Sequence, residues 1–162
     1  MSSTAPYLYA RLMRIALFQP DIAGNVGTIL RLAACWRVPV DVVMPCGFPT
    51  GDKDLQRAAM DYGAAATVTR HADFEAFRSA TAPARLVALT SKGELSLYDA
   101  DFQPDDVLLM GRESAGLPKE VHEKAAMRIR IPMATGFRSL NLAVATGIAL
   151  GEALRQTGQL PE

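Results

Sequence analysis

Three glycine-containing segments carry the residues best placed for chemistry, and each follows a short apolar run. The first is Gln19–Arg31, the second is Leu108–Pro118 and the third is Ile129–Leu142. Apolar runs of this length predict buried strands, and open α/β sheets bind ligands beyond the carboxyl ends of their strands. We therefore expect the three segments to meet at one edge of a sheet.

The first segment does not fit a dinucleotide site. Its glycines, Gly24 and Gly27, have the spacing G-x-x-G, and Asp41 lies at the beginning of the next predicted strand instead of its end. Asn25 stands where a helix cap would satisfy free backbone amides. Arg31 follows on the predicted helix, where either a surface arginine or a functional cation would fit.

The second and third segments place polar residues directly after buried strands. Gly111 would let a backbone approach a ligand closely, so a valine there is expected to block binding without preventing folding. Glu113 is a single carboxylate in a glycine-bounded turn, which a tight turn alone does not explain. Ser139 can cap the last helix and Arg138 can simply be solvated, so structural interpretations of both stay open.

The composition is typical of one globular domain. The chain of 162 residues fits one domain over 13–162 after a tail at 1–12. Cys35 and Cys46 are too isolated for a disulfide framework or a zinc site, so no metal is expected. No segment resembles a signal peptide or reaches the roughly 20 apolar residues that span a bilayer. We expect a cytoplasmic protein that does not enter membranes.

The charge balance argues against a large nucleic-acid surface. Basic and acidic residues number 17 each, whereas nucleic-acid-binding proteins usually have a basic excess. Between Lys92 and Arg112, however, the charged residues are all acidic, so the rest of the chain is mildly basic. A local basic face therefore remains compatible with zero net charge.

Strand and helix patterns alternate, which predicts an α/β fold with a mostly parallel sheet and helices on both faces. Strands are predicted at 14–18, 40–44, 67–70, 85–90, 107–110 and 128–132, and helices at 26–36, 52–60, 73–80, 119–125 and 140–156. From Leu140 to Leu154 the last helix is apolar nearly all round, and one sheet covers only one side. A second copy is the simplest cover for the other side, with Gly147 and Gly151 permitting close approach. We therefore expect a homodimer.

Taken together, the three segments resemble the SPOUT methyltransferases. The shared patterns are N-x-G-x-x-x-R near the start, G-x-E-x-x-G-L-P late in the chain, and I-P-M followed by R-S-L-N-L before the last helix. The likeness covers about 14–156 and is greatest to the TrmL group, the small 2′-O-methyltransferases of the tRNA wobble nucleotide. It implies a carboxyl-terminal trefoil knot that holds S-adenosylmethionine in a bent shape.

The resemblance also implies roles for individual residues. Arg31 matches the essential catalytic arginine of the family, and Arg138 matches a residue placed near the substrate RNA. The implied cofactor contacts are Leu89, Gly111, Ile131 and Ser139. The chain departs from the family at 143–145, where it reads A-V-A instead of S-N-A, and at Gly151, where a tyrosine is common. These departures bear on dimer packing and substrate placement.

The implied reaction moves a methyl group from S-adenosylmethionine to the ribose 2′-hydroxyl of tRNA position 34, leaving S-adenosylhomocysteine. The sulfonium methyl group is already electrophilic, so the reaction needs no metal. Arg31 would stabilise charge on the 2′-oxygen, while a phosphate or water accepts the proton, because a guanidinium does not deprotonate. The alternatives are 2′-O-methylation of another tRNA site or of ribosomal RNA, and a nucleotide-binding regulator without catalysis.

Overall fold

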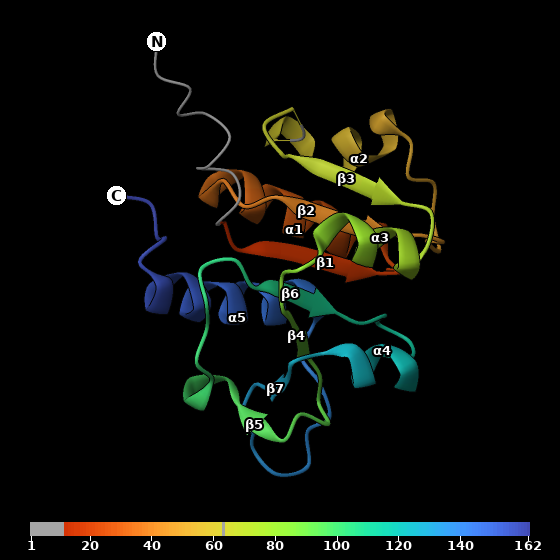
Figure 1. The fold of residues 1–162 in the computed structure, drawn as a ribbon. Helices are drawn as coiled ribbons and strands as arrows, with labels where there is room; N and C mark the ends of the chain where they lie inside the picture. Colours follow the sequence, from red (N-terminus) through yellow and green to blue (C-terminus); the bar gives the residue numbers. More distant parts are fainter. Residues whose placement is uncertain (1–11, 63) are drawn as a thin grey trace.

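The computed structural model describes residues 12–62 and 64–162. Its seven-stranded sheet has the order β3-β2-β1-β6-β4-β7-β5, and all neighbouring strands run parallel (Figure 1). The strands are β1 (Arg14–Phe18), β2 (Val40–Val43), β3 (Val68–His71), β4 (Leu86–Leu89), β5 (Leu95–Ser96), β6 (Val107–Met110) and β7 (Met127–Arg130). The helices are α1 (Ala23–Trp36), α2 (Asp52–Ala58), α3 (Phe74–Thr81), α4 (Lys119–Lys124) and α5 (Leu142–Thr157).

The two faces of the sheet form two separate hydrophobic cores. Alternate side chains of β1 point in opposite directions, as the period of a strand requires. Ile15 and Leu17 pack in the core beneath α1, α2 and α5, whereas Ala16 and Phe18 pack beneath α3 and α4. The predicted α/β fold with a parallel sheet covered on both faces is therefore confirmed.

Most element boundaries fall within three residues of the prediction, and two predicted helix caps are wrong. Helix α1 begins at Ala23, and its N-cap residue is Ile22, which makes no side-chain cap hydrogen bond, so Asn25 lies inside the first turn and is not the cap. Helix α5 begins at Leu142, and its cap is Asn141, whose Oδ1 accepts from the amides of residues 143 and 144 at 2.9 and 3.2 Å. Ser139 lies outside the helix and caps nothing there.

Helix α5 is covered on a second side by α1 of the same chain. A Cβ atom added at Gly151 would lie 3.5 Å from the Trp36 ring, and one at Gly147 would lie 3.7 Å from Leu32. The predicted close approach at these glycines is thus to α1. Val144 nevertheless remains 52% exposed, so the helix still presents an uncovered apolar position.

The amino-terminal tail predicted at 1–12 lies almost wholly outside the described residues, which begin at Leu12. No helix in the described part of the chain is long and apolar enough to cross a membrane.

Candidate functional site

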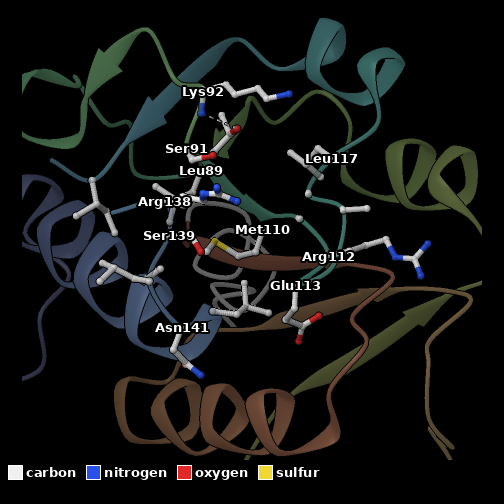
Figure 2. Close-up of a pocket in the computed structure, with 18 of the residues that line it drawn as sticks. Leu89, Ser91, Lys92, Met110, Arg112, Glu113, Leu117, Arg138, Ser139 and Asn141 are labelled. Carbon is white, nitrogen blue, oxygen red and sulfur yellow. Dashed lines mark hydrogen bonds between the residues drawn. The ribbon is translucent and has the colours of Figure 1, made fainter. Parts of the chain in front are cut away.

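A pocket of about 500 Å³ opens where strands β4, β6 and β7 end (Figure 2). Because these parallel strands are neighbours in the sheet, the loops that follow them meet at its carboxyl edge. The beginnings of α1 and α5 complete the wall. The labelled lining residues are Leu89, Ser91, Lys92, Met110, Arg112, Glu113, Leu117, Arg138, Ser139 and Asn141.

The four residues predicted to contact a cofactor all line this pocket. Leu89 is the last residue of β4, Gly111 follows β6, Ile131 follows β7, and Ser139 lies in the loop that leads to α5. They come from positions up to 50 residues apart in the sequence, and the sheet order brings them together. The predicted meeting of segments at one sheet edge is confirmed.

The two predicted arginines lie in different places. Arg138 lines the pocket (Figure 2), whereas Arg31 is exposed on α1 and is not among the lining residues. The Arg31 guanidinium lies over the ring of Tyr62, 4.7 Å from its centroid, which is a cation–π contact. Within one chain, therefore, the two arginines do not meet at the pocket.

Glu113 holds the loop that leads into α1. Its Oε2 accepts from the Asp21 amide at 2.7 Å, and its Oε1 accepts from the Asn25 side-chain amide at 3.3 Å. A carboxylate near the start of a helix also interacts favourably with the helix dipole. This link between two loops explains why a glutamate follows the buried strand, which the sequence pattern left open.

Asn25 extends the same network to the third loop. Its Oδ1 accepts from the Asn141 side-chain amide at 3.0 Å, and Asn141 in turn caps α5. Glu113, Asn25 and Asn141 thus join the segments that follow β6, β1 and β7. The network forms one wall of the pocket.

A second polar cluster, formed by Asp21, Arg112 and Ser114, lies beside this network. Asp21 accepts from the Ser114 hydroxyl at 2.6 Å and from Arg112 Nη2 at 2.9 Å. These hydrogen bonds lower the pKa of the Asp21 carboxyl from 3.8 to about 2, and the bond from the Ser114 hydroxyl has the largest effect. Arg112 Nε is buried without a hydrogen-bond partner. The pairing of Asp21 with Arg112 could not be predicted from the sequence, because 91 residues separate them.

Gly111 is required by its own loop. A Cβ atom there would lie 2.7 Å from the carbonyl carbon of Gly116 and 2.8 Å from the Leu117 amide. The residues between them form a turn closed by mutual backbone hydrogen bonds of Arg112 and Gly116. The close backbone approach predicted at Gly111 is therefore to this turn, so a valine would disturb the fold of the loop itself.

His122 and Lys92 also line the pocket, and Lys92 lies on the side away from α1 (Figure 2). Burial, followed by the charges of Arg128 and Lys92, lowers the pKa of His122 below its ordinary value of 6.5. The imidazole is therefore neutral at pH 7, and Lys92 supplies positive charge at this part of the wall. Among residues 12–62 and 64–162, no group of three or more acidic, histidine or cysteine side chains could hold a metal ion.

The pocket combines apolar walls with polar loops. Leu89, Leu117 and Ile131 offer surface for a flat ring, while backbone groups and Ser139 can orient polar ends. A cavity of about 500 Å³ has the size that suits a small organic ligand. The fold and the pocket define an α/β protein that binds such a ligand at the carboxyl edge of its sheet.

Comparison with known sequences gives the family. The model of the SpoU rRNA Methylase family matches residues 12–151, and the chain belongs to this family. A protein of Beijerinckia indica named tRNA (cytidine(34)-2′-O)-methyltransferase is 49% identical over 90% of this chain and 92% of its own length. The Escherichia coli K12 protein of the same name is 40% identical over 91% and 95%. The resemblance to SPOUT and TrmL proteins is thereby confirmed.

Solved structures show the same architecture. One, described as giving structural insights into the 2-OH methylation of C/U34 on tRNA, has a TM-score of 0.85 and 41% identity, covering 91% of this chain and 97% of that one. An AdoMet-bound rRNA methyltransferase from Sinorhizobium meliloti has a TM-score of 0.79 and 36% identity. It is a longer protein, since the match covers 89% of this chain but 56% of that one.

Proposed function

We propose that this protein is an S-adenosylmethionine-dependent methyltransferase that modifies the ribose 2′-hydroxyl of tRNA position 34 and releases S-adenosylhomocysteine. The observation that carries the proposal is the near full-length identity of 40–49% with enzymes named for that reaction. The pocket supports it, because all four residues proposed to hold the cofactor line the same cavity.

The cofactor suits the pocket by size and by chemistry. Leu89 and Ile131 would contact its apolar parts, while Ser139 and the backbone at Gly111 would orient its polar ends. When bound, S-adenosylmethionine supplies an electrophilic methyl group. The protein must then hold the 2′-oxygen in line with that group and stabilise the charge that develops on the oxygen. The AdoMet-bound relative at 36% identity supports this choice of cofactor.

Two arginines would serve the RNA. Arg138 at the pocket would contact the substrate, and Arg31 would stabilise the reacting oxygen through charge-assisted hydrogen bonds. Because a guanidinium stays protonated, the proton of the 2′-hydroxyl would pass to a phosphate or water. Arg31 lies outside the pocket of its own chain, so this role requires either the pocket of a second copy or an RNA that bridges the two positions.

A homodimer would meet that requirement and cover exposed apolar side chains. Ile22 at the start of α1 is 50% exposed, and Val144 on α5 is also uncovered. In an isologous dimer both copies use the same patch, so the exposed apolar positions of α1 and α5 on one copy would be covered by the same helices of the other. We further propose, from the SPOUT likeness, one knotted domain over 13–162 after a tail at 1–12. A tRNA substrate supports action in the cytoplasm.

The test is to offer labelled S-adenosylmethionine with intact tRNA, an isolated anticodon stem-loop and fragments of ribosomal RNA. We expect label in the ribose of tRNA and none in ribosomal RNA. Label in ribosomal RNA alone would support ribosomal RNA as the substrate. The names of the family and of the Sinorhizobium relative are the observations in favour of this alternative. If none of these RNAs accepts the label, the result would favour a regulator without catalysis.

A further inference from the structure

Phe137 is an exposed aromatic residue in the loop between β7 and α5. Phe137 is 76% exposed, the largest exposed fraction of any large hydrophobic residue in the described part of the chain. It belongs to neither hydrophobic core. The loop forms a turn in which the Phe137 amide donates to the Ala134 carbonyl at 3.4 Å, and Gly136 there has a φ of 96°. The fold therefore displays this ring instead of burying it.

The turn stands at the rim of the pocket. Met133 before the turn and Arg138 after it both line the cavity, so Phe137 lies beside the mouth and not within it. In Figure 2, Arg138 lies near Ser139, between Lys92 and Asn141. An aromatic ring is thus next in the chain to a cation that lines the pocket, and Lys92 adds a second cation to the lining.

We propose that Phe137 stacks on a nucleobase of the RNA substrate, while its chain neighbour Arg138 and the pocket-lining Lys92 contact phosphates. This inference rests on the proposed function. Single-stranded RNA is commonly recognised by splayed bases that stack on aromatic side chains, and phosphates pair with nearby cations. Because the chain has zero net charge, its hold on RNA must come from local contacts of this kind.

The surroundings of Phe137 favour a base over a protein partner. Residues 134–136 in the turn are Ala, Thr and Gly, and the nearest large apolar residues along the chain, Met133 and Leu140, are much less exposed than Phe137, at 37% and 39%. The centre of a protein interface needs a packed apolar patch, whereas stacking needs only one flat face and tolerates any base. The positive charges of Arg138, next in the chain, and of Lys92 in the pocket also complement RNA.

Four variants test the inference: Phe137→Ala, Phe137→Leu, Phe137→Trp and, as the control, Tyr98→Ala. Tyr98 is also an exposed aromatic residue, at 59%, but it does not line the pocket. Phe137→Ala should raise KM for an anticodon stem-loop about 5- to 100-fold, with unchanged affinity for S-adenosylmethionine. Phe137→Leu should raise this KM nearly as much, because leucine keeps the apolar bulk but has no ring. Phe137→Trp and Tyr98→Ala should stay near wild type.

Abasic stem-loops identify the stacked base. With the base removed at position 33, 34 or 35 in turn, one abasic substrate should make wild type and Phe137→Ala equally weak, because both lack the same contact. The inference would be overturned if the effects of base removal and of Phe137→Ala added at all three positions, or if Phe137→Leu behaved like wild type. A smaller sedimenting species for Phe137→Ala would also overturn it, since this would make the ring an interface residue. An active wild type with a normal Phe137→Ala refutes this inference alone, whereas a wild type inactive on tRNA refutes the proposed function as well.

Discussion

Asp21 and Glu113 come from different loops, and each accepts several hydrogen bonds from the segment that holds the other. Asp21 faces Arg112 and Ser114, while Glu113 faces the start of α1. Neither carboxylate is free to act on a substrate proton in this arrangement. Their contribution is to hold the loops in position, which preorganises the pocket for its ligand.

The pKa of Asp21 predicts a dependence of stability on pH. Its folded value of about 2 lies below the ordinary 3.8, so its stabilising effect is present above about pH 4 and is lost as pH falls toward 2. Urea unfolding should show Asp21→Asn less stable than wild type at pH 6, with the gap narrowing at pH 3. The exposed Asp99→Asn is the control and should leave the curve unchanged at pH 6. An equal gap for Asp21→Asn at both pH values would contradict this explanation.

Arg31 is predicted to affect transfer without affecting cofactor binding. Arg31→Ala should lower the single-turnover rate by orders of magnitude, since the charge on the 2′-oxygen loses its cation. Affinity for S-adenosylmethionine should hold, because Arg31 does not line the pocket. Arg57→Ala, an exposed arginine on α2, is the matched control. A near-normal rate for Arg31→Ala would make this residue a surface arginine that stacks on Tyr62.

At the scale of residues, a family pattern in the sequence pointed to several residues that line the pocket. The sequence did not show the hydrogen bonds that hold the pocket wall together. Leu89, Gly111, Ile131 and Ser139 all line the pocket, and their contact with a cofactor stays a prediction. The hydrogen bonds from Asn25 to Glu113 and Asn141 span 88 and 116 residues, and such pairs carry no local signal. The position of Arg31 outside the pocket also depends on tertiary packing.

At the scale of elements, the loop after β6 depends on a glycine. Gly111→Ala would force its Cβ against the Gly116 backbone, so it should destabilise the fold by about 1–3 kcal/mol and weaken cofactor binding. Gly24→Ala in α1 is the control. Its Cβ would meet open space, so the change should be neutral or stabilising by up to about 1 kcal/mol. Chemical unfolding and calorimetry measure both. Unaltered stability of Gly111→Ala would refute the role assigned to this turn.

Periodicity predicted the strands and helices well where they are long or strongly apolar. Strands β1 and β6 match the predicted boundaries, because both are runs of buried residues, apart from the half-buried Arg14 that begins β1. Strand β5 has only two residues, Leu95 and Ser96, and such a short strand forms through pairing with β7. The start of α1 was placed three residues late because Ile22 caps it without a side-chain hydrogen bond.

At the scale of the whole molecule, we predict a homodimer whose copies complete one another. Sedimentation at low micromolar concentration should give about twice 17.4 kDa. Arg31→Ala co-expressed with the pocket-blocking variant Ile131→Trp should recover about a quarter of wild-type activity, since half the dimers are mixed and each has one competent site. Arg31→Ala alone and Ile131→Trp alone are the controls. A fully active monomer would refute the dimer, and no recovery in mixed dimers would place the action of Arg31 within one chain.

The most direct test of the central claim is to locate the transferred methyl group. tRNA from cells that lack this protein is incubated with it and with S-adenosylmethionine that carries a deuterated methyl group, then digested and mapped by mass. We predict one labelled methyl on the ribose of nucleotide 34, which also blocks alkaline cleavage on its 3′ side. Label on a base, at another nucleotide or only in ribosomal RNA would contradict the proposed function.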